Sequence, residues 1–497
     1  MNNRPVQSRC VLGVDLGTSS CKVSLVHEWG SVIHSTTAAY PTHAPQPGWA
    51  EQDPQDWITA ATQAVVRLMT SPQAAGCDVQ GIGLTCAAHI GVLLDEQHQP
   101  LRRAILWNDL RSASQARDLH ETQGKLILHQ SGQIASCSWT LAHLRWVLEH
   151  EPSVHARIRR ILLSKDYLAW RLTGEMATDH ATAVSSQLYD VTTYQWSDRL
   201  CALAGVTTDM LPEVVPARTI VGRLRADMAS AMHLPADIPV VTGTLDSATE
   251  LLAADCIRPG DRMIRLATAG GLQIVTNQLH RHEKRITYPH VYCHTWYVQA
   301  GTSSCASAVQ WARDRFAPGW SWEKLIDCAA ASPPGSQGLL FHPYLQGERA
   351  PYWNPHLKAG FTGLTLAHDT GDLLRSVLEG TCFSIGDAMR VMEDLPASNL
   401  PIKIVGGGSR NALWVAILAS VLNTPLVPQP EVDSALGAAI LAWQSLGHET
   451  ASFVTHASQP VNPDPHLADL YHERFEVYQS IAQRMLLTSQ DKKVPLS

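Results

Sequence analysis

The pattern of apolar and polar positions near the start of the chain predicts two strands joined by a tight turn. An apolar run over 11–14 ends in Asp15, small and hydroxyl residues fill 17–20, and a second apolar run covers 22–26. Apolar and β-branched runs on both sides of a Gly/Thr/Ser cluster are the local signal of a β-hairpin. We therefore expect a hairpin here, with Asp15 beside its turn.

The same reading predicts strands and helices along the rest of the chain. A helix is expected over 54–69, because apolar residues recur at helical spacing after Asp53, a suitable N-cap. The other expected strands are 31–38, 80–85, 91–94, 238–241, 262–266, 272–275 and 403–405, and the other expected helices begin near 165, 247, 412 and 466. Such an order favours α/β layers built on a mixed sheet. The strand–turn–strand unit at 262–275 echoes the first hairpin, so we predict two related domains, 1–250 and 251–497.

Composition narrows the class of protein but not its chemistry. The 497 residues are 45% hydrophobic and 17% charged, which is typical of globular domains with sizeable cores. The formal charge of −7 and the absence of a basic block argue against a nucleic-acid or anionic-membrane partner. No signal-peptide core or bilayer-length apolar stretch is found, and the 11 cysteines include no CxxC pair. We therefore expect a cytoplasmic protein.

The turn of the first hairpin carries residues that suit a phosphate and a divalent cation. Backbone N–H groups of a small-residue turn form a cradle for anions, and Thr18 and Ser19 lie in this turn. The carboxylate beside that cradle, Asp15, is explained if Mg²⁺ lies between it and phosphate oxygens. Lys22 can add a positive charge for a phosphate. From these residues alone, an ordinary surface hairpin with Asp15 as a turn acid is an equally good interpretation.

Two later positions suggest similar chemistry. Asp246 ends a predicted strand and opens a helix of small residues, where it is either a general base or the N-cap of that helix. The strand 403–405 runs into three glycines at 406–408 and then into a helix. That geometry suits an anion or nucleotide site, and it also suits simple helix–strand packing. The residues themselves leave both pairs of alternatives open.

A group of histidines suggests a metal site, but its pattern does not support one. His280, His282, His290, Cys293 and His294 lie close together in the sequence. The segment alternates like a strand, and strand residues four apart do not have the geometry of a helix face. We expect no structural metal there.

Several longer motifs make the chain resemble the FGGY family of carbohydrate kinases. The segments DLGTSSCKV at 15–23, AGFTGL at 359–364 with DLLRSVLE at 372–379, GGGSRN at 406–411 and SALGAA at 434–439 stand in the family's order. Within the family the chain is most similar to the xylulokinases, through the segments 48–54, 104–109, 165–168 and 344–349. The resemblance spans residues 11–442, nearly the whole chain.

The resemblance implies an α/β fold of two actin-like, ribonuclease H-like domains flanking a central cleft. It also implies phosphoryl transfer from ATP, with Mg²⁺, to a hydroxyl of a ketose, first of all a pentulose such as xylulose. Two other functions stay open. One is a kinase for another ketose or for a polyol (a tetrulose, a hexulose, ribulose or a glycerol-like polyol), and the other is a non-catalytic actin-like protein that binds nucleotide and sugar. A homodimer is also left open.

By their places in these motifs, the resemblance gives each candidate residue a role. Asp246 is the general base and a sugar contact, and Asp15 holds Mg²⁺ near the transferred phosphate. The implied nucleotide-binding residues are Thr18, Ser19 and Lys22 in the first turn, Thr268, Gly270 and Gly271 in a second phosphate turn, and Gly406, Gly407, Gly408 and Asn411 at the adenosine. The implied sugar-binding residues are His89, Trp107, Asn108 and Asp109.

Four positions depart from the family's pattern. The turn 86–91 differs from the usual Gln-Met-His-Gly, Ser247 replaces an Asn that contacts the sugar, and His143 replaces a Lys. Ala267 replaces a Gly in the second phosphate turn, and its Cβ disfavours a left-handed backbone. These changes cluster on the sugar side and in one phosphate turn, so they bear on the substrate more than on the reaction class.

Overall fold

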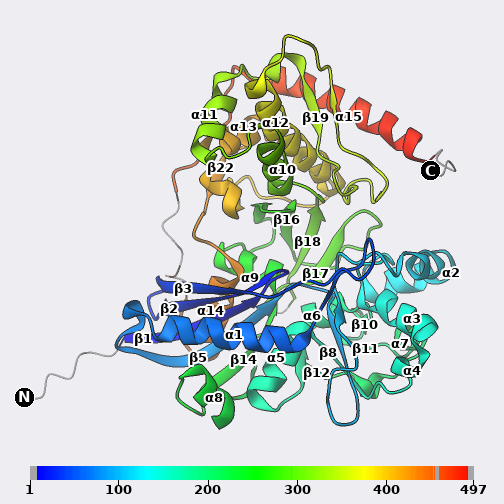
Figure 1. The fold of residues 1–497 in the computed structure, drawn as a ribbon, viewed down its shortest axis with the longest axis vertical. Coiled ribbons are helices and arrows are strands. Elements are labelled where there is room, and N and C mark those ends of the chain that lie inside the picture. Colours follow the sequence, from blue (N-terminus) through cyan, green and yellow to red (C-terminus); the bar gives the residue numbers. More distant parts are fainter. Residues whose placement is uncertain (1–7, 293, 451–452, 454–457, 491–497) are drawn as a thin grey trace, which may run out of the picture.

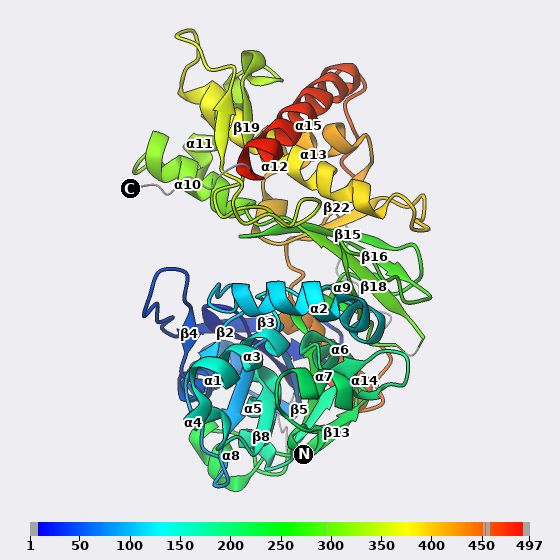
Figure 2. The same cartoon turned by 90° about the vertical axis from the view of Figure 1, so that its right-hand side faces the viewer.

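The computed structural model describes residues 8–490 except 293, 451–452 and 454–457, and it forms two lobes, each built on a six-stranded sheet (Figures 1 and 2). The strands of the first sheet are, in spatial order, β13 (Ile220–Arg223), β14 (Pro239–Leu245), β5 (Cys77–Cys86), β1 (Ser8–Leu16), β2 (Ser20–His27) and β3 (Val32–Ala39). Those of the second are, in spatial order, β17 (Ile286–Pro289), β18 (Trp296–Gly301), β16 (Gly270–Thr276), β15 (Arg262–Leu266), β21 (Ile402–Val405) and β22 (Leu426–Pro428).

Five strands of each sheet share one topology, which supports the predicted relation between the halves of the chain, while the sixth strand lies beyond β14 in the first sheet and beyond β18 in the second. In the first sheet β1 pairs with β2 antiparallel and with β5 parallel, and in the second β15 pairs with β16 antiparallel and with β21 parallel. Beyond the hairpin each sheet adds a further antiparallel strand, β3 or β18. Beyond the parallel neighbour each adds another parallel strand, β14 or β22. Each sheet is therefore mixed, as the sequence predicts.

Helices and short strand pairs surround the two sheets. The helices up to the end of the first sheet are α1 (Pro54–Met69), α2 (Ala113–Ser131), α3 (Thr140–His150), α4 (Pro152–His155), α5 (Ser164–Thr173), α6 (His180–Ser185), α7 (Asp198–Leu203), α8 (Ala226–Met232) and α9 (Asp246–Ala253). The later ones are α10 (Ala306–Phe316), α11 (Trp322–Ala331), α12 (Thr370–Met389), α13 (Ala412–Leu422), α14 (Ser434–Ser445) and α15 (Ala468–Gln490). The short strand pairs are β4 (Glu51–Gln52) with β7 (Ala104–Ile105), β6 (Gly91–Leu94) with β8 (Arg160–Leu163), β9 (Ala177–Asp179) with β12 (Glu213–Val215), β10 (Tyr189–Asp190) with β11 (Gln195–Trp196), and β19 (Leu340–His342) with β20 (Gly360–Thr362).

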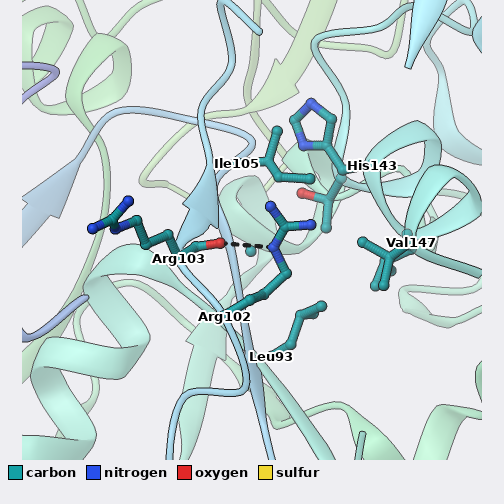
Figure 3. Close-up of a pocket in the computed structure, with 9 residues that line it drawn as sticks. Leu93, Arg102, Arg103, Ile105, His143 and Val147 are labelled. Carbon is teal, nitrogen blue, oxygen red and sulfur yellow. Dashed lines mark hydrogen bonds between the residues drawn. The ribbon is translucent and has the colours of Figure 1, made fainter. Parts of the chain in front are cut away.

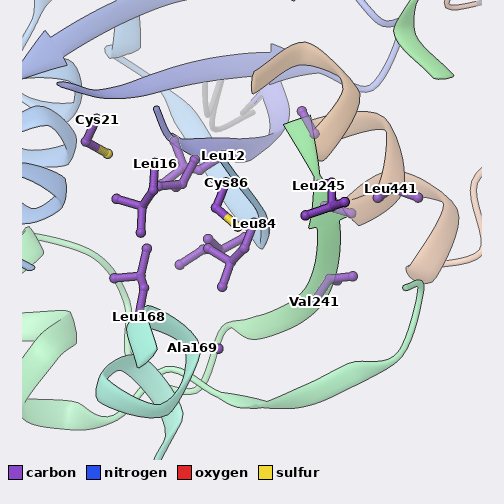
Figure 4. Close-up of a cluster of buried hydrophobic side chains, with 14 of the residues drawn as sticks. Leu12, Leu16, Cys21, Leu84, Cys86, Leu168, Ala169, Val241, Leu245 and Leu441 are labelled. Atoms are coloured by element: carbon purple, nitrogen blue, oxygen red, sulfur yellow. The ribbon is translucent and has the colours of Figure 1, made fainter. Parts of the chain in front are cut away.

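Helix α14 lies late in the sequence but packs on the first sheet (Figure 1). Its Leu441 shares a core with Leu84 of β5 and Leu245 of β14, as Figure 4 shows. The approach is close, because a Cβ on Gly13 of β1 would lie 1.9 Å from the carbonyl oxygen of Ala435. The predicted boundary between 250 and 251 falls inside α9, and it stays a prediction.

Each lobe has its own apolar core. The first is built on β1, β2, β5 and β14 together with α1, α9 and α14. The second is built on β15, β16, β18 and β21 together with α10, α12 and α13. A third, smaller cluster lies among α2, α3 and α7, beside the first lobe (Figure 2). The first cluster also includes Met263, Val275, Tyr297 and Val405 of the second sheet, so apolar packing continues from the first lobe onto one face of that sheet.

Most local predictions are confirmed. Helix α1 has the predicted bounds, and the Asp53 side chain accepts a hydrogen bond from the Gln55 N–H at 2.9 Å. The strand-like alternation read over 291–297 is confirmed only at its end: Tyr297 lies in β18, whereas the described residues of 291–295 form the turn between β17 and β18, and His294 has a φ of 61°. Cys293 lies outside the described residues.

Two kinds of feature are missing from the described residues. No group of three or more His, Cys, Asp or Glu side chains among them is arranged to hold a metal ion. None of the helices that the structure describes is long and apolar enough to cross a membrane.

Candidate active site

The two predicted acids lie at the same edge of the first sheet. Asp15 is the penultimate residue of β1, and Asp246 follows β14 directly as the first residue of α9. Both β1 and β14 run parallel to β5, which lies between them, so their carboxyl ends meet at one edge. Asp246 is near enough that its charge raises the pKa of Asp15. The structure thus brings together two acids that are far apart in the sequence.

The Asp15 carboxylate has one oxygen without a donor. Its Oδ2 accepts a hydrogen bond from the Ser434 hydroxyl at 2.6 Å, while its Oδ1 is buried and has no hydrogen-bond partner in the described part of the chain. Burial, followed by the charges of Asp246 and Asp433, raises the pKa of Asp15 to about 7. A buried carboxylate oxygen without a donor is costly, and a bound cation would relieve that cost.

Asp246 faces the other lobe. Its Oδ1 accepts the backbone N–H of Ser247 at 2.7 Å, and its Oδ2 lies 3.5 Å from the Arg265 guanidinium of β15. The N-cap alternative for Asp246 is wrong, because α9 begins at Asp246 and its N-cap is Leu245, without a side-chain cap bond. The Asp246 Oδ1 therefore satisfies one free N–H of the first turn of α9, while its Oδ2 stays directed at the other lobe.

Two charged neighbours of Asp246 were not predicted. Glu250, one turn along α9, lies 3.4 Å from Arg265 through its Oε1, while its Oε2 is buried and unpartnered in the described residues. Burial raises the pKa of Glu250 to about 8 in spite of Arg265. The signal in the sequence was an acid four residues after Asp246 and an arginine just before a predicted phosphate turn.

Lys22 does not point at Asp15 in this structure. It lies opposite Asp15 in the β1–β2 register, but its ammonium forms an ion pair with Asp433, the N-cap of α14. Asp433 and the adjacent Ser434 are further residues that sequence reasoning missed, although an Asp–Ser pair before a helix is a recognisable cap signal. Helix α14 therefore contacts both Asp15 and Lys22 of the first hairpin.

The first predicted phosphate turn is tied to the sugar-side residues. The Thr18 hydroxyl accepts a hydrogen bond from the Trp107 indole at 3.1 Å, and the Thr18 carbonyl accepts one from the Gln52 amide at 2.8 Å. Ser19 is exposed, and the Gly17 carbonyl accepts a bond from the Tyr40 hydroxyl. Hydrogen bonds from Trp107, Gln52 and Tyr40 thus fix the turn, while Ser19 is exposed to solvent.

The second and third predicted turns lie side by side. β15 leads into the second turn and β21 into the third, and these strands are parallel neighbours. In the second turn the Thr268 carbonyl accepts the N–H of Cys305 at 3.0 Å, and the Gly270 N–H donates to Thr302. Ala267 does not adopt a positive φ, so its Cβ brings no left-handed strain to this turn.

The third turn is packed against the end of β15. Gly406 has a φ of 89°, and a Cβ there would lie 2.7 Å from the Leu266 carbonyl oxygen. A Cβ added to Gly407 would have no atom within 4 Å, so this side of the turn is open, and Gly408 is buried. Asn411 caps α13 by accepting the Trp414 N–H at 3.1 Å. Gly271, of the second turn, lies opposite Arg265 in the neighbouring hairpin strand.

On the predicted sugar side, His89 is held neutral among aromatic rings. Burial lowers the pKa of His89 to about 3. Its Nδ1 lies 2.8 Å from the Ser185 carbonyl, so Nδ1 carries the proton and Nε2 accepts from the Tyr288 hydroxyl at 3.3 Å. The Trp139 ring lies edge-on to the His89 ring, and the two ring centroids are 4.1 Å apart. Tyr288 and Trp139 were not predicted.

The other three predicted sugar residues have different surroundings. Trp107 is half-buried, with the Arg349 guanidinium 5.9 Å from its ring, and Asn108 is exposed. Asp109 is fully buried, and its oxygens accept bonds from the Arg111 guanidinium at 2.8 and 2.9 Å and from the Ala50 N–H. A direct sugar contact by Asp109 stays a prediction, and its present partners make it a support for the turn around Trp107.

His143 lines a small internal cavity rather than a sugar-sized one. The cavity has a volume of about 10 Å³ and lies between Arg102, Ile105 and His143 (Figure 3). A volume of that size holds about one water. A larger hollow of about 680 Å³, lined by Arg281, Lys284 and other charged residues, contains none of the predicted site residues.

Comparison with known proteins decides the family. Models of the FGGY family of carbohydrate kinases match this chain, the N-terminal domain over residues 10–253 and the C-terminal domain over 271–446. The chain belongs to the FGGY family of carbohydrate kinases. The xylulose kinase of Escherichia coli (strain K12) is 32% identical over 488 residues, which cover 96% of this chain and 99% of that protein. The xylulose kinase of Bacillus subtilis (strain 168) is 30% identical over 482 residues, 95% of this chain and 96% of that protein.

Solved structures agree with the fold of this FGGY kinase. A xyloylose kinase from Brucella ovis has a TM-score of 0.88 and 30% identity, covering 97% of this chain and 100% of that chain. The xylulose kinase from Rhodospirillum rubrum has a TM-score of 0.87 and 28% identity, with the same coverage. The predicted two-domain, actin-like and ribonuclease H-like fold is therefore confirmed, and the protein is a sugar kinase of a family that uses ATP.

Membership also gives meaning to the departure at Ser247. In this FGGY kinase the Ser247 hydroxyl is buried and lies 2.7 Å from the Tyr297 hydroxyl of β18. It therefore joins the two lobes beside Asp246.

Proposed function

We propose that this FGGY kinase transfers the γ-phosphoryl group of ATP to a hydroxyl of a pentulose such as xylulose. The observation that carries the proposal is the meeting of Asp15 and Asp246 at one sheet edge, with the Asp246 carboxylate 3.5 Å from Arg265, which stands just before the second turn in the other lobe. The relatives named xylulose kinase support a pentulose as the acceptor. Other acceptors are tested as well, because a relative from Bacillus licheniformis that is 27% identical is named gluconokinase.

Asp246 is the group that receives the acceptor's proton. A bond forms between the acceptor oxygen and the γ-phosphorus, the bond from that phosphorus to the β–γ bridging oxygen breaks, and ADP leaves with the electron pair. The hydroxyl proton passes to Asp246 Oδ2, which faces the other lobe. Phosphoryl transfer depends mainly on position and charge, so Asp246 orients the hydroxyl as well as deprotonating it.

Asp15 is the residue that would hold Mg²⁺. Its buried, unpartnered Oδ1 and its raised pKa fit a cation-binding carboxylate. Mg²⁺ commonly takes one or two carboxylates and completes its shell with phosphate oxygens and water, which agrees with the lack of a three-residue set in the described chain. When bound, the ion neutralises charge on the phosphate groups.

Different turns bind different parts of the nucleotide. The backbone N–H groups near Thr18 and Ser19 and that of Thr268 in the second turn bind phosphates. Gly270, whose N–H already donates to Thr302, and Gly271 let the backbone of that turn approach them. The open third turn, with Gly406, Gly407, Gly408 and the helix cap Asn411, binds the adenosine. Lys22 reaches a phosphate only if it leaves Asp433.

The acceptor lies beside the neutral His89 and the half-buried Trp107. His89 Nε2 accepts hydrogen bonds, which suits a sugar hydroxyl in place of Tyr288. Asn108, being exposed, can contact an acceptor from the same turn. We place the reaction in the cytoplasm, since the ten described cysteines are all free thiols. A homodimer stays a prediction that light scattering can test.

The deciding experiment measures ADP release from ATP and Mg²⁺ with a panel of ketoses, aldonates and polyols. Xylulose is expected to be the best acceptor, and Asp246→Asn should lower kcat by at least about 10²-fold. Asp227→Asn, at an exposed position of α8, is the matched control and should leave kcat unchanged. Near-normal turnover of a folded Asp246→Asn enzyme would refute the assignment, and ATP hydrolysis that no sugar stimulates would favour a binding protein without kinase activity.

A further inference from the structure

Arg265 stands between the two nucleotide turns of the second lobe. Across the β15–β16 pair its backbone partner is Gly271, and across the β15–β21 pair its partner is Val405, the residue before Gly406. Arg265 is also the penultimate residue of β15, directly before the second phosphate turn. Its backbone is thus fixed at the point where both turns begin.

The Arg265 side chain crosses to the other lobe and reaches the acids there. Its guanidinium lies 3.5 Å from Asp246 and 3.4 Å from Glu250, two residues one turn apart on α9. Its charge also bears on Asp15. No other arginine or lysine forms an ion pair with Asp246 or Glu250 among the described residues.

The guanidinium is held loosely and is accessible. Tight charge-assisted bonds measure about 2.7–2.9 Å, as the bond from Arg111 to Asp109 does at 2.8 Å. Both contacts of Arg265 are longer, and its side chain is 38% exposed whereas that of Glu250 is 7% exposed. A guanidinium has five N–H donors, so donors are left for a further anion.

We propose that Arg265 contacts the transferred phosphoryl group and that Glu250 is the positioning residue that aims it. This inference rests on the proposed function. In the transfer, negative charge spreads over the three outer oxygens of the phosphoryl group while the bond to ADP breaks and the bond to the acceptor forms. A planar guanidinium beside the proton acceptor Asp246 meets those oxygens, and Arg suits such a contact better than Lys. Glu250, fixed on α9 and largely buried, keeps the guanidinium from pairing with Asp246 alone.

The test replaces Arg265 by Met and by Lys and measures steady-state kinetics. We expect Arg265→Met to lower kcat by at least about 10²-fold while the KM values for ATP and sugar change by less than about threefold, as for a contact made in the transition state. Arg265→Lys should recover only part of the loss. Arg262→Met is the matched control, because Arg262 lies on the same strand and donates to the Leu400 carbonyl, and its kcat should stay normal.

Glu250→Gln separates a positioning role from a structural one. We expect it to lower kcat by about tenfold in the wild-type background and to have no further effect in Arg265→Met, because the pair acts as one unit. Equal, additive losses in both backgrounds would overturn the role of Glu250. A normal kcat in folded Arg265→Met, or a raised sugar KM with kcat unchanged, would overturn that of Arg265.

A binding measurement keeps this inference apart from the proposed function. Fluoroaluminate with ADP imitates the planar phosphoryl group, and wild-type protein should bind ADP more tightly when it is present. Arg265→Met should lose that gain while binding ADP alone as before, and an undiminished gain would overturn the inference. The proposed function fails by a different result, namely a wild-type protein that releases no ADP with any acceptor. In that case the fluoroaluminate measurement still tests the role of Arg265.

Discussion

Replacing Gly437 by Ala should damage the active site, although Gly437 is not one of the predicted site residues. Gly437 lies on α14 where that helix crosses α9, and a Cβ there would lie 2.0 Å from the Thr249 carbonyl oxygen. Ordinary van der Waals contact begins near 3.4 Å, so the two helices must separate by about 1.4 Å. Both helices carry site residues, since α9 presents Asp246 and α14 presents Ser434 to Asp15.

The size of the effect follows from that displacement. Overpacking a dense interface costs about 1–3 kcal/mol, which corresponds to a fall of about 2–12 °C in Tm for a domain of this size. A misplacement of about 1 Å can lower turnover by about 10²-fold. We therefore expect Gly437→Ala to lower both Tm and kcat, with a normal circular dichroism spectrum at low temperature.

The assay is thermal unfolding followed by tryptophan fluorescence, together with ADP release at saturating ATP and sugar. Gly360→Ala is the control, because no atom lies within 4 Å of its added Cβ and its φ is not positive. It should change neither quantity appreciably. A Gly437→Ala protein with the Tm and kcat of wild type would show that the helices yield without cost, and it would refute the argument from packing.

Three further predictions concern buried or half-buried groups, Glu348, Asp109 and Trp107. Glu348→Gln should raise the stability towards urea at pH 8 but not at pH 4.5. Burial raises the pKa of Glu348 to about 7, so the folded state loses about 3 kcal/mol of stability as the pH rises from about 4.5 through 7. An amide does not ionise and avoids that loss. Asp109→Asn should lower stability by about 1.5–3 kcal/mol in the same unfolding experiment, because it removes one of the two carboxylates, Asp109 and Glu51, that pair with the buried Arg111. Trp107→Phe should lower kcat by about tenfold in the ADP-release assay, since the Thr18 hydroxyl loses its indole donor and the turn loosens.

Each of these has a result that would contradict it. For Glu348→Gln it is a change in stability that is the same at both pH values. The amide fits the site, because it can still accept the Ser303 and Arg349 N–H groups and donate to Ser384. For Asp109→Asn it is an unchanged unfolding midpoint. For Trp107→Phe it is a normal kcat, with Trp322→Phe, an exposed residue of α11, as the control.

The local structure of this protein could be predicted from the sequence because its signals are short-range. The first hairpin follows from the apolar runs on both sides of a small-residue turn, and α1 follows from its apolar spacing and the Asp53 cap. The strand before the glycines at 406–408 and the helix after them have the same origin. The ordered motifs then indicated the family, and with it the fold and the candidate acids.

Only the tertiary structure decided what surrounds those acids. The Ser434 hydroxyl on Asp15 and the Arg265 guanidinium between Asp246 and Glu250 join segments that no local pattern connects. Asp109 stands in a predicted sugar-binding motif, yet packing buries it against Arg111. Periodicity and turn chemistry act over a few residues, whereas the charge environment of a site depends on how distant strands and helices pack, and that is set by the close approach of α14 to the first sheet.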